Sequence, residues 1–93
     1  MQITDGITDG IRAYRWGKVV FMSFEGVTLT RNVSANNPFS SVPMSYVPAY
    51  SVSFKDSLSN KRIVIEHVTG YIFCTEALTS GTNLRGFMTY LTN

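Results

Sequence analysis

The side chains that could catalyse a reaction are few and scattered along this chain of 93 residues. His67 is the single histidine, and its neighbour Glu66 would point to the opposite face if both lie in a strand. A glycosidase needs two carboxyl groups at a fixed separation, and a general base needs partners. No spacing marks such a pair among Asp5, Asp9, Glu25, Asp56, Glu66 and Glu76. We therefore predict no catalytic residue, and we expect His67 to be a surface or interface residue.

Few residues of this chain could bind a metal ion or a cofactor. Cys74 is the single cysteine, which excludes an internal disulfide and a site built from several thiolates. Its apolar surroundings in the sequence indicate a small buried residue. The glycines are isolated and form no phosphate-binding loop. We therefore predict no metal site and no cofactor.

The charge composition disfavours nucleic-acid binding and membrane insertion, and it favours an oligomer. The formal net charge is +2, and Lys61-Arg62 is the single pair of adjacent basic residues, so no basic stripe is expected. No run approaches the roughly 20 apolar residues of a membrane span. Charged residues make up 15% and hydrophobic residues 44% of the chain, so a small domain has apolar surface left over. We expect another copy or a preceding segment to bury part of it; the alternative is a monomer covered by Ser and Thr.

Strand signals dominate the chain from Ile11 to Leu91. Runs rich in β-branched and aromatic residues are separated by Gly, Asn, Asp and Ser at intervals of about 8–12 residues. This spacing predicts an all-β fold, a small antiparallel β-sandwich of jelly-roll or Greek-key type. Gly26 is expected to break or bulge the chain. The expected strands are Ile11–Arg15, Lys18–Glu25, Val27–Arg31, Ala49–Lys55, Lys61–His67, Tyr71–Ala77 and Leu84–Leu91.

The first ten residues contain a short repeat. The unit Ile-Thr-Asp-Gly occurs at Ile3–Gly6 and again at Ile7–Gly10. Asp-Gly is a turn dipeptide, and two units of this length cannot build a core. We therefore predict a connector or arm over residues 1–11, followed by a single head domain over residues 12–93.

The stretch Asn32–Pro48 is the one long connection that the pattern predicts. Prolines cannot donate to a strand ladder, so the prolines of this stretch favour a crossover between the two sheets. Phe39, Val42 and Tyr46 would pack this crossover onto the end of the sandwich.

The segment "ANNPFSSVPMSYVPAYSVSF" resembles part of the C-terminal head domains of phage tail-fibre and receptor-binding proteins. Those domains tend to carry a polar Ala-Asn run, a Leu-Pro-x-Gly-Tyr-x-Pro-like turn and a strand that ends in an aromatic residue. Val42-Pro43 stands in the Leu-Pro place and Tyr46 and Pro48 in the Tyr-x-Pro place, while Ser45 replaces the glycine. The hairpin sequence "YRWGKVVFMSFEGVTLT" and the closing "FMTYLTN" are similar to the first hairpin and the terminal strand of such heads.

The resemblance implies a location and a function. Such heads are β-sandwiches at the tip of a fibre or on a baseplate of the virion tail, and they are made in the cytoplasm of the bacterial host. They are usually homotrimers that bind a carbohydrate or another ligand on the host cell surface. An upstream shaft or neck would then enter the head through the arm. The resemblance therefore implies a receptor-binding protein that is not an enzyme.

Aromatic residues are the candidates for such a carbohydrate site. Sugars stack on aromatic faces while amide and charged groups bind the hydroxyls. For Tyr50 the core is the favoured alternative, because it would share a strand face with Val52 and Phe54; Phe24 and Phe87 are further candidates for the core. The candidate ligand-binding residues are Trp16, Tyr46, Tyr50, Asn36, Asn37 and Arg85.

Two other functions stay open on the sequence. The first is a structural trimerisation or capping domain of a fibre, without a receptor site of its own. The second is a small glycan hydrolase or esterase, which the single histidine and the unpaired carboxylates disfavour.

Overall fold

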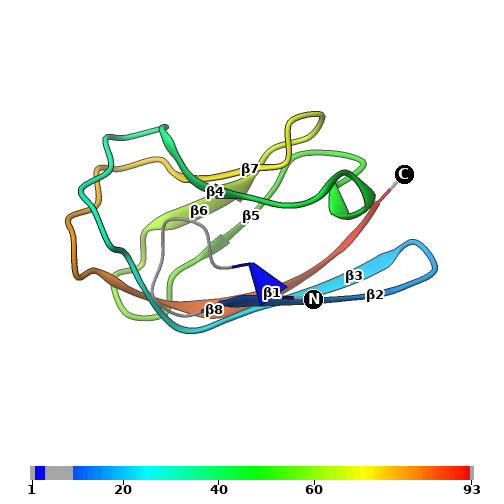
Figure 1. Cartoon of the computed structure of the whole chain (residues 1–93), viewed down its shortest axis with the longest axis horizontal. Coiled ribbons are helices and arrows are strands. Elements are labelled where there is room, and N and C mark those ends of the chain that lie inside the picture. The colour runs from blue at the N-terminus through cyan, green and yellow to red at the C-terminus, as the bar shows by residue number, and fades with distance from the viewer. Residues whose placement is uncertain (1, 4–9, 93) are drawn as a thin grey trace.

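Two antiparallel sheets of four strands pack face to face (Figure 1). The computed structural model describes residues 2–3 and 10–92. The sheets have the orders β1-β2-β3-β8 and β4-β7-β6-β5, which confirms the predicted small β-sandwich. The strands are β1 (Gln2–Ile3), β2 (Ile11–Trp16), β3 (Val19–Thr28), β4 (Pro38–Ser41), β5 (Val52–Lys55), β6 (Arg62–Ile65), β7 (Tyr71–Cys74) and β8 (Asn83–Leu91).

The first sheet is fixed by a tight hairpin and by alternation. Trp16 of β2 pairs with Val19 of β3, so a turn of two residues joins them, and Gly17 in this turn has a φ of 60°, as such hairpins require. Trp16 is thus the last residue of β2, one residue beyond the predicted strand Ile11–Arg15. The alternation of the three long strands builds this side of the core: Ile11, Ala13, Val20, Met22, Phe24, Leu84 and Tyr90 are buried, Met88 is half-buried, and Arg15 near the end of β2 is exposed.

A bulge at Gly26 lengthens β3. The register with β8 shifts between Glu25 and Val27, and Gly26 has a φ of 70°, which glycine adopts without strain. The bulge predicted at Gly26 is therefore confirmed. The separate strand predicted over Val27–Arg31 is wrong, because β3 continues through the bulge to Thr28.

The second sheet is a Greek key. Short turns join β5 to β6 and β6 to β7, whereas β4 lies beside β7 and reaches β5 through a long connection across one end of the sandwich. This connection contains one turn of 3-10 helix, η1 (Met44–Tyr46). The prediction of one uninterrupted connection over Asn32–Pro48 is therefore wrong, because β4 lies within it. Pro38 fits there because it is the first residue of an edge strand.

Most packing predictions for this connection hold. Phe39 and Val42 are buried, and Tyr46 is half-buried against the core. Cys74 is buried as expected. Tyr50 is the exception: it lies before β5 and is 81% exposed, so its predicted place in the core is wrong.

The predicted arm over residues 1–11 lies largely outside the described residues. Its described part includes β1, which pairs antiparallel with Ile11 and Arg12 of β2. The first sheet thus gains a short edge strand.

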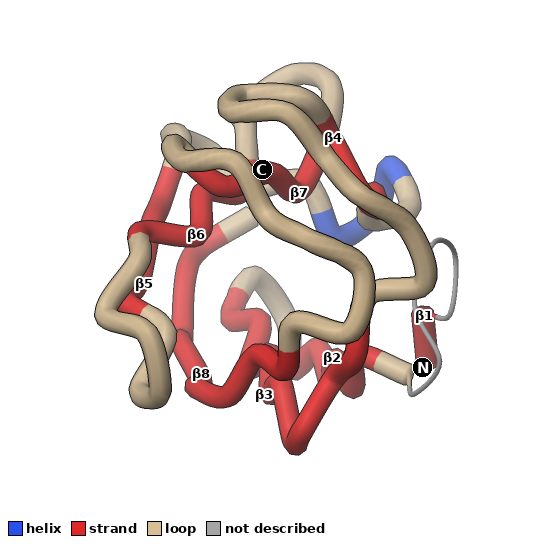
Figure 2. Tube along the Cα trace, turned by 90° about the vertical axis from the view of Figure 1, so that its left-hand side faces the viewer, coloured by secondary structure: helices blue, strands red, loops and turns tan. Residues whose placement is uncertain are grey.

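The two sheets meet along β5 and β8, which lie side by side at one edge of the sandwich (Figure 2). The backbone N–H of Ser57 donates to the carbonyl of Arg85 across this seam at 2.9 Å. A Cβ atom at Gly86 would lie 2.6 Å from the ring of Phe54. The glycine is therefore what allows β8 to approach β5 so closely.

Candidate binding face and groove

The outward side of β2, β3 and β8 is an unusually apolar surface, which we name the outer face. Its members alternate with the core residues of the same strands, and all of them except the buried Ser23 are exposed or half-buried. They are Arg12, Tyr14, Trp16, Val19, Phe21, Ser23, Glu25, Arg85, Phe87, Thr89 and Leu91. Among the described large hydrophobic residues, five exposed ones gather here: Tyr14, Trp16, Val19, Phe87 and Leu91. The solvated face of a sheet is normally polar. The exposed apolar side chains of this face do not pack in the core, so folding alone does not explain them.

The strand register divides the outer face into two halves. Next to the hairpin, Trp16, Val19 and Leu91 form one row across the three strands, and Tyr14, Phe21 and Thr89 form the next. We name these two rows the apolar half, and none of their side chains is charged. The rings of Tyr14 and Trp16 stack with centroids 6.2 Å apart.

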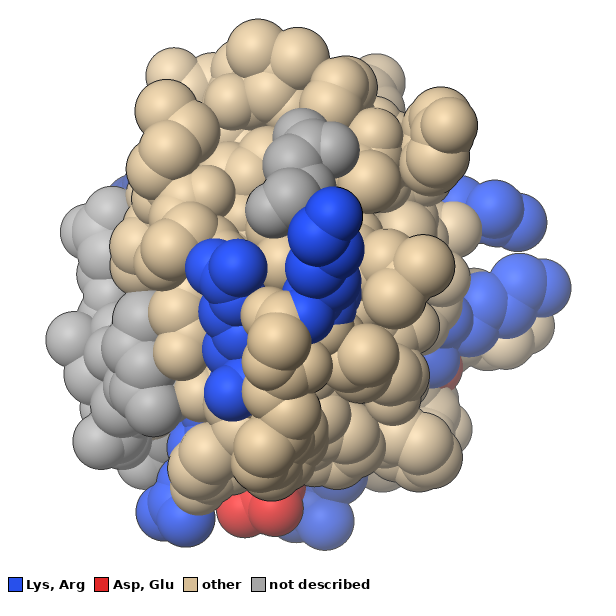
Figure 3. Space-filling model, turned by 90° about the vertical axis from the view of Figure 1, so that its right-hand side faces the viewer, with Lys and Arg blue, Asp and Glu red and all other residues tan. Residues whose placement is uncertain are grey.

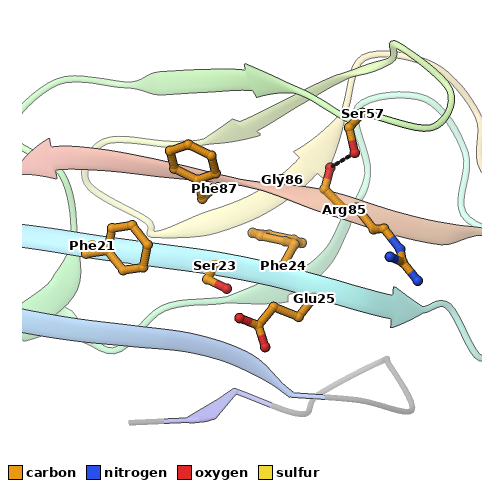
Figure 4. A pocket seen from close by; sticks show the side chains of 8 residues that line it. All are labelled: Phe21, Ser23, Phe24, Glu25, Ser57, Arg85, Gly86 and Phe87. Carbon is orange, nitrogen blue, oxygen red and sulfur yellow. Dashed lines mark hydrogen bonds between the residues drawn. The ribbon is translucent and has the colours of Figure 1, made fainter.

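The other half of the outer face carries the polar groups and a groove of about 500 Å³. Figure 4 shows the rings of Phe21 and Phe87 side by side above the sheet, with Ser23 and Glu25 on the same side. The two ring centroids lie 6.1 Å apart. The groove is lined by Phe21, Ser23, Phe24, Glu25, Ser57, Arg85, Gly86 and Phe87.

Asp56 fixes the backbone of the groove. This buried carboxylate accepts hydrogen bonds from the backbone N–H of Arg85 at 2.6 Å and from the N–H and hydroxyl of Ser59 at 2.8 and 2.6 Å. Burial raises the pKa of Asp56, but these hydrogen bonds outweigh it, so the pKa is lowered from its ordinary value. The carbonyl of Arg85 is also held, because the hydroxyl of Ser57 donates to it at 3.1 Å (Figure 4).

The side chain of Arg85 remains available to a ligand. It is exposed and extends away from the two rings (Figure 4). Its Nη2 lies 3.5 Å from the place that a Cβ atom would take at Gly26, so the guanidinium rests against the bulge. Strand β8 thus presents Phe87 and Arg85 on one side, while Gly86 between them faces the core.

The groove combines aromatic rings with hydroxyl, carboxylate and guanidinium groups. Such a mixture suits a ligand that has both apolar faces and hydroxyl groups, such as a sugar. Glu25 is the one carboxylate among the groove's described lining, so the two-carboxylate arrangement of a glycosidase is not formed there. Within residues 2–3 and 10–92, no three His, Cys, Asp or Glu side chains gather where they could hold a metal ion.

The structure separates the six candidate residues that the sequence suggested. Trp16 and Arg85 lie on the outer face, in different halves. Tyr46 and Tyr50 belong to the connection between β4 and β5.

Asn36 and Asn37 lie in the turn before β4, near the end of the sandwich opposite the β2–β3 hairpin. Asn36 adopts a φ of 64° and its N–H donates to the carbonyl of Cys74 at 2.8 Å, so its backbone shapes the turn. The six residues therefore do not form one site.

Sequence reasoning missed Phe21, Ser23, Glu25 and Phe87. The core alternative for Phe87 is wrong, since its side chain is 70% exposed, whereas Phe24 is buried and Phe54 packs against the core. The missing signal was the side-chain direction in β8. Because Leu84 and Tyr90 are both buried, the odd-numbered residues between them must face outward.

His67 has a structural role. Its ring is half-buried, and Nδ1 donates to the carbonyl of Pro48 at 2.8 Å. Its backbone N–H donates to the hydroxyl of Ser51 at 2.9 Å. The residue therefore joins the turn after β6 to the segment that precedes β5.

The basic side chains do not merge on the end of the sandwich that holds the C-terminus. Figure 3 shows them on this end standing apart, with uncharged atoms between them. Among the described residues, no helix has the length and apolar character needed to span a membrane.

Comparison with known proteins adds no family to this description. No protein-family model matches the chain, and no curated protein matches it either. The functional argument therefore rests on the outer face and its groove.

Proposed function

We propose that this domain is the receptor-binding head of a phage or phage-like tail fibre, and that it attaches the particle to a carbohydrate on the host cell surface. In this proposal the head is a homotrimer at the fibre tip or baseplate of the virion tail, and it is not an enzyme. The protein would be made in the bacterial cytoplasm, and an upstream shaft would carry the head. The groove beside Phe21 and Phe87 is the observation that supports the proposal best.

The groove offers a sugar two complementary kinds of contact. The exposed ring of Phe87 can stack on the apolar face of a pyranose. The exposed Glu25 and the largely buried Ser23 lie on the same side and can bind its hydroxyl groups, with Arg85 at the margin. Because a carboxylate and a guanidinium line the same groove, we expect a neutral saccharide rather than a strongly acidic one.

A titration of the chain with bacterial surface saccharides, followed by NMR, tests this proposal. We expect shifts to concentrate at Phe21, Ser23 and Phe87, and Phe87→Ala to weaken binding at least tenfold. Tyr50→Ala is the control because Tyr50 is exposed but lies outside the groove. Absence of binding by a broad saccharide panel, or binding that survives Phe87→Ala, would contradict the proposal.

The second candidate is a structural domain that trimerises or caps a fibre without binding a receptor. The apolar half favours it, because a large uncharged surface suits contact with protein. A chain that forms stable trimers, binds no saccharide and is required for fibre assembly would support this candidate over the first.

A further inference from the structure

We infer that the apolar half of the outer face is the surface on which a second copy of this chain docks. This inference rests on the oligomer in the proposed function and deepens it by naming the contact surface. It does not depend on saccharide binding. The contact is made by Tyr14, Trp16, Val19, Phe21 and Leu91, with Thr89 between them.

The exposed area matches what a protein contact needs. Trp16 is 65% exposed and Leu91 is 62% exposed. Together with Tyr14 and Val19 they present roughly 450 Å² to solvent, if a whole side chain of this size offers about 150–250 Å². A standard interface buries about 800 Å² per partner, and a little over half of that is apolar. The apolar half therefore supplies about the apolar area of one side of a stable interface.

Its chemistry fits a protein better than a sugar. Aromatic residues are enriched and charged residues depleted at the centre of protein interfaces, and the apolar half has this composition. A sugar needs more hydrogen-bonding groups than the hydroxyls and the indole N–H present there. Two copies with the same net charge of +2 also avoid direct repulsion where no charged side chain stands.

The distribution of charge on the outer face favours one orientation of the copies. A symmetry axis parallel to β3 brings one apolar half against another in a dimer or a trimer. If two copies overlap along the whole outer face, the reverse orientation would place Trp16 and Leu91 over the half that carries Arg12, Glu25 and Arg85. In the parallel arrangement, all grooves lie at the same end of the assembly, which favours multivalent binding to one surface.

Molar mass in solution, measured by light scattering across a range of concentrations, tests the inference with two matched pairs of variants. Leu91 on the apolar half and Leu58 in the turn after β5 are both 62% exposed. Tyr14 on the apolar half is 45% exposed and Tyr71 on β7 is 46% exposed. Each pair therefore removes nearly the same exposed side chain from a different surface.

We expect the full chain to form oligomers, and Leu91→Ser and Tyr14→Ser each to weaken association at least 30-fold, as loss of an interface hot spot does. Leu58→Ser and Tyr71→Ser should leave the association constant unchanged. The inference is overturned if the unaltered chain stays monomeric up to about 300 µM, or if the controls weaken association as much as the test variants. Should Leu91→Ser fail to fold, the tyrosine pair decides.

Saccharide binding by the same variants is measured separately, by the NMR titration described above. Phe87→Ala should weaken binding at least tenfold without changing the molar mass, and the monomeric variants should keep the affinity of a single groove. Loss of oligomers therefore overturns the inference, whereas loss of saccharide binding overturns the proposed receptor.

Discussion

The two outward surfaces of the sandwich are built on the same alternation but carry different side chains. The surface of the second sheet presents Lys55 and Arg62, whose guanidinium donates to the hydroxyl of Ser53 at 3.2 Å. Its apolar members Val64 and Phe73 are half-buried, and Tyr71 is its one exposed large hydrophobic residue among those described. The outer face of the first sheet instead leaves large apolar side chains open to solvent. Because folding requires only the inward side of each sheet, this difference is the basis of our proposal that the first sheet binds a partner.

The largest expected effect separates inward from outward aromatic residues on the first sheet. Phe24 is 2% exposed and its ring lies 5.0 Å from that of Phe54. We expect Phe24→Ala to lower the free energy of unfolding by about 3–5 kcal/mol, because it leaves a cavity. Phe87→Ala should lower it by less than about 0.5 kcal/mol, as exposed substitutions do. Urea unfolding at a concentration where the chain is monomeric measures both, and similar losses would remove the distinction between the two sides.

Gly86→Ala is expected to have the next largest effect. The added methyl group would lie within 3 Å of the Phe54 ring, so the strand or the ring must move, at a cost of about 1–3 kcal/mol. Thr89→Ala, on the outward side of the same strand, is the control and should change stability by less than about 0.5 kcal/mol. Urea midpoints for the two variants provide the comparison. Equal stability of Gly86→Ala and the unaltered chain would show that β8 and β5 do not approach as described.

The smallest effect concerns pH and the seam between the sheets. Hydrogen bonds lower the pKa of Asp56 from its ordinary value of 3.8, so this group contributes stability above the pKa of the unfolded chain. That contribution is lost as pH falls through the lower pKa of the folded state. Asp56→Asn should reduce this fall in stability below about pH 4. Thermal unfolding at several pH values measures the difference, and parallel curves for the unaltered chain and Asp56→Asn would contradict the role of Asp56.

The sequence was sufficient to predict the fold class, because alternation and turn residues are local signals. The bulge at Gly26 could be predicted for the same reason. Strand β4 was missed because its sequence, Pro-Phe-Ser-Ser, has few strand-forming residues. It becomes a strand through pairing with β7, which lies far along the chain.

The candidate site was harder to predict than the fold. An aromatic residue gives the same sequence signal whether its side chain faces the core or the solvent. Which side it faces depends on where its strand lies in the sheet. Tyr50 and Phe87 were both assigned a core alternative and are both exposed. The groove also depends on Asp56 and Arg85, which are brought together by the seam between two sheets.

The fluorescence of Trp16 tests the central claim most directly. Trp16 is the single tryptophan of the chain and lies within the apolar half. Quenching by acrylamide should be strong in dilute solution, where the indole is open to water, and should weaken as the chain associates. The account predicts that this protection rises with concentration at the same midpoint as the molar mass. An indole that stays equally accessible while the mass rises would contradict it, because copies would then meet through another surface.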